Sequence, residues 1–295
     1  MRIAHCISGT VRGAPDPAVE AFTHNFVHGF KSSLDPRARN ATSDVFMVLE
    51  LEDETNVASN NVGTTNSKYG IWQLGQMLHK LAPVVVEMVA VPSNDTNACD
   101  PDPANHHTPS CPTGAEMICK YASQWNKVKR CYELVQAHEA KLGRRYDWVT
   151  RIRPDAYLTA RNDFKSAWSL DSVLRRARTF VANYSQRESM APTYNIHYGP
   201  PKNVVGDHFA IVPRARADTY FALRDAFDMC VEMKELGKRC HGPLHNPTWV
   251  PPDCVSNYWL RVVQEMPLAG TESMDEVLIH MVRSSGVQRG ERAYF

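Results

Sequence analysis

The strongest constraint on the fold is the regular alternation of strand-like and helix-like segments along the first half of the chain. Apolar runs typical of strands occupy residues 2–8, 44–51 and 84–91, and residues 18–30 and 68–82 carry apolar side chains at helical spacing. Strands joined through helices pair in parallel, because the helix returns the chain to the same end of the sheet. The alternation therefore predicts an α/β fold with a mostly parallel sheet wrapped by helices. The run at 84–91 is rich in β-branched residues, so we expect a strand that is buried on both faces.

A long helix is predicted after a Pro- and Asn-rich loop at residues 92–112. Thr113 and Glu116 have capping-box spacing, and Gly143 can end the helix in a left-handed turn after about Leu142. Its apolar stripe should pack on the sheet; the stripe comprises Met117, Tyr121, Trp125, Val128, Tyr132 and Val135. Three basic residues off this stripe are expected on a solvated face: Lys127, Lys129 and Arg130.

The segment YDWVTRIRPDAYL, residues 146–158, follows this helix and has the pattern of a fourth strand that carries charges. Side chains alternate across a strand, so Arg151, Arg153 and Asp155 share one face. Pro154 cannot donate to a ladder, so regular pairing should end there. Open parallel sheets bind ligands beyond the carboxyl ends of their strands, where these charges lie. Two interpretations stay open: a site for a phosphate group and its cation, or an internal Arg–Asp ion pair.

The second half of the chain adds an acid and a histidine as candidates. Asp207 lies in the strand-like run NVVGDHFAIVPR, at a turn-prone Gly-Asp pair. It could act as a general base, position the substrate or cap a local turn. The run TESMDEVLIHMVRSSG predicts a helix that begins with Ser273 and Glu276 in capping-box spacing and ends at Gly286. Glu276 is therefore expected to be a cap rather than a catalyst. His280 is a candidate metal ligand, with packing or a surface position as the alternative.

Charge and hydropathy narrow the partners and the compartment. Lysine and arginine total 33 against 32 acids, a net charge of +1, so the composition gives no sign of a nucleic-acid surface. No apolar run approaches the roughly 20 residues of a membrane span, and the first residues lack a signal-peptide core. We expect either a cytoplasmic protein or a soluble domain of a membrane-anchored parent.

The cysteines and sequons favour the second of these options. Two cysteine clusters suit disulfides that cross-link loops, with buried thiols as the alternative: Cys99, Cys111, Cys119 and Cys131, then Cys230, Cys240 and Cys254. No spacing fits a zinc finger. Three sequons agree with a glycoprotein of the secretory lumen; they begin at Asn40, Asn94 and Asn183.

Taken together, these segments resemble the nucleotide-sugar-dependent glycosyltransferases of the GT-A type. The matching segments are IAHCISGTVR, YASQWNKVKRCYELVQAHE, YDWVTRIRPDAYL, VVGDHFAIVPRARADTYF and MDEVLIHMVRSSG. Their order, CISGxxR, RxRPD and then GDxFA, is similar to that of glycosyltransferase-like proteins of algae, algal viruses and bacteria. The resemblance implies one GT-A-like domain over residues 1–295, with a nucleotide-sugar-binding half at 1–158 and an acceptor-binding half at 159–295.

The resemblance implies transfer of a hexosyl or pentosyl group from a UDP- or GDP-sugar to a hydroxyl of a glycan or protein-linked acceptor. In this family the fourth strand ends in Asp-X-Asp, whose carboxylates hold Mn²⁺ or Mg²⁺ against the diphosphate. Here Asp155 takes the place of the second acid and Arg153 that of the first. Guanidinium groups could then neutralise the leaving diphosphate, with a cation as a helper or absent.

The remaining roles also follow from the resemblance. The turn that holds the nucleotide would be Ser8, Gly9, Thr10 and Arg12, with Gly9 letting the backbone approach the ligand. Arg151, Arg153 and Asp155 would face the diphosphate, Asp155 and His280 are the candidate metal ligands, and Asp207 would orient or deprotonate the acceptor.

Several alternatives to this transferase stay open. Inversion and retention of configuration are equally compatible with the sequence. The chain would work in the Golgi or secretory lumen as a trimmed ectodomain, or in the cytoplasm if viral or full-length. A non-catalytic glycan- or partner-binding protein on the same fold is the main rival. A two-domain fucosyltransferase-like enzyme is disfavoured by the irregular second half.

Overall fold

The computed structural model describes residues 1–11, 17–28, 41–50, 71–89, 115–160, 180–184, 204–228, 259, 277–283 and 286–287. The elements in chain order are β1 (Arg2–Thr10), α1 (Pro17–His28), β2 (Thr42–Glu50), α3 (Ile71–Leu81), β3 (Val85–Val89), α5 (Ala115–Leu142), β4 (Trp148–Ile152), β5 (Ala156–Ala160), β6 (Phe180–Tyr184), β7 (Val204–Pro213), α8 (Arg214–Phe221), a 3₁₀ helix (Ala222–Asp228), β8 (Val277–Arg283) and β9 (Gly286–Val287). No described helix is both long and apolar enough to cross a bilayer.

A six-stranded mixed sheet organises the molecule, with strand order β3-β2-β1-β4-β7-β6. β1 pairs in parallel with both β2 and β4, and β2 pairs in parallel with β3. β7 pairs antiparallel with β4 and with β6, so β7 alone of the six described strands runs in reverse. The predicted mostly parallel α/β sheet is therefore confirmed.

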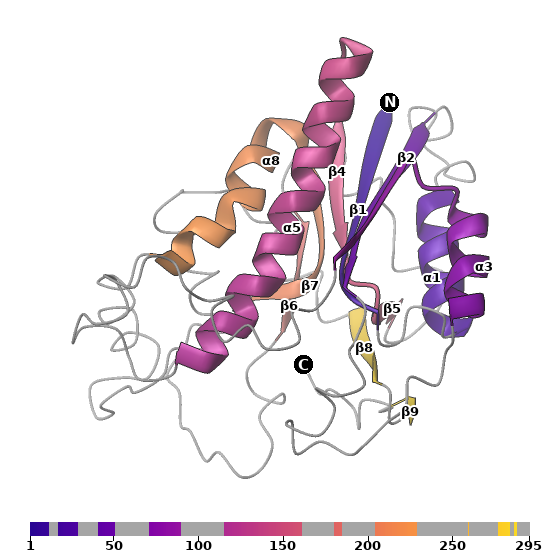
Figure 1. The fold of residues 1–295 in the computed structure, drawn as a ribbon, viewed down its shortest axis with the longest axis vertical. Helices are drawn as coiled ribbons and strands as arrows, with labels where there is room; N and C mark the ends of the chain where they lie inside the picture. Colours follow the sequence, from indigo (N-terminus) through magenta and orange to yellow (C-terminus); the bar gives the residue numbers. More distant parts are fainter. Residues whose placement is uncertain are drawn as a thin grey trace.

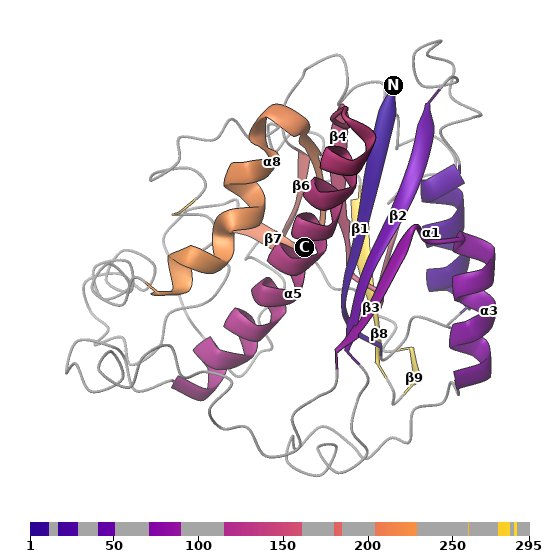
Figure 2. The ribbon, with the colours of Figure 1, turned by 45° about the horizontal axis from the view of Figure 1, so that its top comes forward.

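Helices cover both faces of this sheet, as Figures 1 and 2 show: α5 and α8 lie on one face, and α1 and α3 lie on the other. The predicted stripe of α5 is buried where its side chains are described, at Trp125, Val128, Tyr132 and Val135. Gly143 has φ +64° and ends the helix as expected. The core between α5 and the sheet is completed by residues such as Phe46, Val149, Tyr220 and Phe221.

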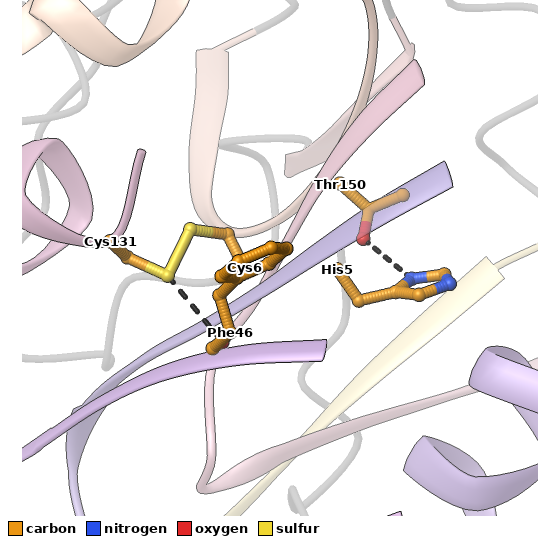
Figure 3. The surroundings of a disulfide bond; sticks show 5 residues. All are labelled: His5, Cys6, Phe46, Cys131 and Thr150. Atoms are coloured by element: carbon orange, nitrogen blue, oxygen red, sulfur yellow. Dashed lines mark hydrogen bonds between the residues drawn. A yellow bond between two sulfur atoms is a disulfide. The ribbon is translucent and has the colours of Figure 1, made fainter. Parts of the chain in front are cut away.

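A disulfide joins the sheet to α5 within this core (Figure 3). Cys6 of β1 and Cys131 of α5 have Cα atoms 5.8 Å apart and are both fully buried. The sequence predicted that Cys131 would cross-link a loop with its cluster, and this was wrong, because its partner lies 125 residues away in the first strand. The Cys131 Sγ also lies 3.5 Å from the carbonyl oxygen of Phe46, which is a hydrogen bond only in the thiol form.

Two local predictions are corrected by the sheet pairing. The apolar run that contains β3 is not buried on both faces: Val84, Val86 and Met88 are 37–42% exposed, because β3 is the edge strand. The predicted terminal helix is instead β8, which pairs antiparallel with β5. Pairing with β5 supplies the backbone hydrogen bonds of this segment, and a local capping-box pattern carries no information about such a distant partner. Ser273 and Glu276 lie outside the described residues.

The amino edge of the parallel strands is closed by paired charges. Arg2 donates to Asp44 through Nη2 at 3.0 Å, and its backbone N–H donates to Asp147 at 2.6 Å. Nearby, Arg214 of α8 makes a bidentate, buried ion pair with Glu139 of α5. These ion pairs occupy the amino edge, whereas open parallel sheets bind ligands beyond the carboxyl ends of their strands, so a ligand site is expected at the opposite edge.

Candidate functional site

The carboxyl ends of three parallel strands meet at one edge of the sheet. β1 and β2 end together, because Thr10 is the register partner of Glu50. β4 ends at Ile152, which lies opposite Ile7, so Arg153 leaves the sheet at the same edge. The small sheet of β5, β8 and β9 lies next to this edge in Figure 1.

Arg153 and Asp155 form a bidentate ion pair in the turn that follows β4. Arg153 Nε donates to Asp155 Oδ1 and Nη2 donates to Oδ2, both at 2.8 Å. The Asp155 carboxylate is almost fully buried, and the Arg153 side chain is 19% exposed. Of the two interpretations left open by the sequence, the described side chains adopt the internal ion pair, with the guanidinium on the solvent side.

Arg151 lies deeper than its neighbour. It is fully buried between the sheet and α5, where its guanidinium carbon is 4.6 Å from the centroid of the Trp125 ring. Its register partner in β1 is Cys6. The predicted alternation is confirmed here, because Arg151 and Val149 both face α5. A ligand at the edge would therefore meet Arg153 before Arg151.

The end of β1 packs directly against this turn. Gly9 has φ +145°, and a Cβ at this position would lie 3.0 Å from Pro154 Cδ. The glycine is thus required by the contact between the two strand ends, and Pro154 occupies the space that we expected a ligand to approach. Beside it, Ser8 is fully buried, and its hydroxyl has no hydrogen-bond partner within the part of the chain that the structure describes.

A second ion pair lies on the β2 side of the same strand end. Glu50 Oε2 accepts a hydrogen bond from Thr10 Oγ1 and lies 2.8 Å from Lys127 Nζ. Lys127 was predicted on a solvated face, and this was wrong: it is only 8% exposed. Lys129 and Arg130 do lie on a solvated face, where they are 42% and 48% exposed and pair with surface carboxylates.

Sequence reasoning missed Glu50 and Lys127 as residues of this edge. A signal for Glu50 was available, since it is the last residue but one of the predicted strand 44–51 and alternation places it on the face of Phe46 and Val48. Lys127 gave no such signal, because helical periodicity shows which residues lie off the apolar face but not which residues of other elements they contact.

The backbone of Asp207 reaches the same edge from the other direction. Phe209 of β7 pairs with Ile152, the last residue of β4. Because β7 runs antiparallel to β4, residues before Phe209 extend past the end of β4 towards the Arg153 turn. Gly206 and Asp207 do not form the expected turn, since both lie within strand β7. The structure describes the backbone, not the side chain, of Asp207.

His280 is placed near this edge by strand pairing rather than by a helix. It lies in β8 opposite Tyr157, and the next pair is Met281 with Ala156, which directly follows Asp155. The two predicted metal ligands are therefore brought onto neighbouring segments of chain. Arg12, the last predicted nucleotide-binding residue, lies outside the described residues.

A buried histidine on the opposite face of the sheet belongs to the core. His5 Nδ1 lies 2.9 Å from Thr150 Oγ1 (Figure 3), and Nε2 lies 3.1 Å from Ser43 Oγ. Full burial, together with the nearby His28, lowers the pKa of His5 to about 3, so the ring is neutral. Its two ring nitrogens contact hydroxyls of neighbouring strands and the side chain is closed to solvent, so His5 holds β1, β2 and β4 together.

The described side chains do not compose a cation site. Both oxygens of Asp155 accept from Arg153, whose positive charge disfavours a second cation there. No group of three or more metal-ligating side chains occurs in the described ranges. This edge carries two positively charged side chains, two carboxylates and a buried hydroxyl, which are Lys127, Arg153, Glu50, Asp155 and Ser8. Such a set can form hydrogen bonds to a charged, hydroxyl-rich ligand.

No protein-family model matches the chain, and no curated protein matches it. The residues of the edge are therefore the basis for a functional proposal.

Proposed function

We propose that this chain is a glycosyltransferase of GT-A-like fold that moves a sugar from a nucleoside-diphosphate donor to a hydroxyl of a glycan or protein-linked acceptor. One observation carries the proposal. Strand register brings the end of β1, the Arg153–Asp155 turn, the backbone of Asp207 and that of His280 to one edge of a mostly parallel sheet. That edge is where open α/β sheets bind nucleotides.

The proposed chemistry breaks the bond between the anomeric carbon and the donor phosphate oxygen. The electron pair leaves with the nucleoside diphosphate. Arg153 would stabilise its negative charge directly, and the positive charge of the buried Arg151 would stabilise it from a greater distance. The acceptor oxygen forms the new bond to the anomeric carbon, and Asp207 takes its proton if configuration inverts. Ser8 and Thr10 at the end of β1, together with Arg12, would hold the nucleotide, and Gly9 lets Pro154 pack beside them.

The Asp155 carboxylate is not assigned to a divalent cation in the proposed chemistry. Asp155, the expected ligand, is engaged by Arg153 at both oxygens, so it serves in this proposal to orient the guanidinium. Mn²⁺ or Mg²⁺, if bound elsewhere at this edge, would supply further charge to the leaving diphosphate.

Thermal shift with UDP-, GDP- and CMP-sugars, with and without Mn²⁺ or EDTA, tests the proposal. A donor at about a hundred times its Kd should raise the melting midpoint by roughly 5 °C, because it binds only the folded chain. Arg153→Ala should lose this shift. Arg130→Ala should keep it, since Arg130 is also held by a carboxylate, Glu87, but on a solvated face beside the outermost strand β3. If no nucleotide shifts the wild-type midpoint, the proposal fails.

Turnover is tested separately by release of the nucleoside diphosphate. Asp207→Asn should retain the thermal shift and lose about a hundredfold or more of the transfer rate if Asp207 is the general base. An Asp207→Asn variant with wild-type turnover would remove this residue from the mechanism and leave retention as the outcome to examine.

A non-catalytic glycan-binding protein is a second candidate, favoured by one observation. Arg153 and Asp155 already form an ion pair with each other, and Arg151 is fully buried. In this reading the three charged residues stabilise the fold and do not bind a nucleotide. Such a protein would bind a glycan without releasing nucleoside diphosphate from any donor. Arg153→Ala would then lower the stability and leave nucleotide affinity unaffected.

A further inference from the structure

Two ion pairs flank the end of β1 on its two sides. Lys127 with Glu50 lies on the β2 side, and Arg153 with Asp155 lies on the β4 side. Neighbouring strands are about 4.8 Å apart, and the end of β2 lies three residues beyond the register of the end of β4, so the two ends are separated by about 14 Å. Two long cationic side chains that extend from opposite sides can approach one ligand across such a gap. Ser8 belongs to β1, the strand between the two pairs.

Lys127 is an unusual residue to bury on α5. Its helix neighbours Lys129 and Arg130 place their charges in solvent, whereas Lys127 is 8% exposed and pairs with an acid on another element. A buried Lys–Glu pair adds little net stability compared with apolar residues of the same size, because both charges lose their hydration. Stability alone therefore does not account for a charge at this position.

The Ser8 hydroxyl points to a ligand independently of the charges. It is fully buried and lacks a hydrogen-bond partner among the described residues. An unsatisfied hydroxyl costs free energy in the unliganded protein, and an oxygen-rich ligand at this edge would satisfy it. Thr10, two residues further along the strand, already donates to Glu50 and so fixes that carboxylate beside Lys127.

We propose that Lys127 is a further donor-binding residue, which forms with Arg153 and Ser8 an anion site for the diphosphate whose cations are held in advance by Glu50 and Asp155. This inference rests on the proposed function and extends it to a residue of α5. In the resting state the four charged groups sum to zero, so the site is stable without ligand. The diphosphate competes with Glu50 for Lys127, and the returning carboxylate favours release of the product.

Binding of inorganic diphosphate by calorimetry at low ionic strength tests this site without a nucleotide. Lys127→Met should weaken binding by about tenfold to a hundredfold, because a hydrogen bond between two charged groups is lost. Lys129→Met is the matched control: it removes a lysine two residues away that pairs with Asp225, and should bind like wild type. Lys127→Arg keeps the charge and should recover most of the affinity.

Glu50→Gln gives a result that a structural role would not produce. It keeps the shape of the side chain and removes the charge that competes for Lys127, so diphosphate should bind roughly two- to fivefold more tightly. This variant also decides the question if Lys127→Met fails to fold. Weaker or unchanged binding in Glu50→Gln, or equal binding by the Lys127→Met and Lys129→Met variants, overturns the inference.

The two proposals fail in different ways. Diphosphate binding that depends on Lys127, in a protein that binds no sugar nucleotide, would retain the anion site and reject the transferase. Sugar-nucleotide binding that depends on Arg153 but is indifferent to Lys127 would retain the transferase and reject the anion site.

Discussion

At the scale of single residues, His5 makes the stability of the fold depend on pH. In the unfolded chain a histidine has a pKa near 6.5, and in the fold burial lowers the pKa of His5 to about 3. Between these values the unfolded state binds one more proton, so stability is complete above pH 6.5 and falls as the pH is lowered. We expect His5 to account for a loss of about 1.4 kcal/mol by pH 5.5.

Urea unfolding of wild type and His5→Gln at pH 7.5 and 5.5 measures this contribution, as the difference between the losses of stability of the two proteins. His79→Gln, which changes an exposed histidine of α3, should behave as wild type. A His5→Gln variant as acid-sensitive as wild type would contradict the assignment.

The residues of the edge divide by how they could be found in the sequence. Arg153 and Asp155 were predictable, because alternation along one strand is a local property and Pro154 marks where the strand ends. Their partnership was left open, since only the turn geometry decides whether the two side chains meet each other. Lys127 was predicted wrongly because its position depends on Glu50, which is 77 residues earlier in the chain and reaches it only through the packing of α5 on the sheet.

At the scale of elements, the Cys6–Cys131 disulfide couples β1 to α5. The bond lies one helical turn from Lys127 and two strand residues from Ser8, so it fixes the helix against the strand that ends in the site. It closes a loop of 125 residues, for which chain entropy predicts a stabilisation of about 5 kcal/mol. We expect Cys6→Ala/Cys131→Ala to lose about this amount in urea unfolding. Wild type unfolded and refolded with reductant should match the variant, and peptide mapping without reductant should recover the Cys6–Cys131 pair. Two titratable thiols at these positions in the oxidised wild type, or an unchanged stability, would contradict the bond.

Elements were predictable where a local pattern is long and wrong where pairing decides. The 28-residue helix α5 shows its stripe and its glycine stop directly in the sequence. The run VLIHMVR is too short for its period to separate a helix from a strand, and its pairing with β5, more than a hundred residues earlier, settles it as β8. The edge position of β3 is likewise a property of strand order, which apolar content does not reveal.

At the scale of the whole molecule, the two edges of the sheet are expected to respond differently to a ligand. The amino edge is closed by backbone bonds, in which Asp147 N–H donates to the Arg2 carbonyl and Arg214 N–H donates to the Asp147 carbonyl, both at 2.9 Å. The carboxyl edge carries the ion pairs and the Ser8 hydroxyl.

Hydrogen exchange with saturating diphosphate should slow at peptides covering residues 7–11 and 152–156, because the ligand suppresses local opening there. Peptides covering 145–148 and 214–218 should exchange at unchanged rates. Arg153→Ala serves as the control and should show no protection at either edge. Protection at the amino edge, or in the control, would move the site away from the strand ends on which both proposals depend.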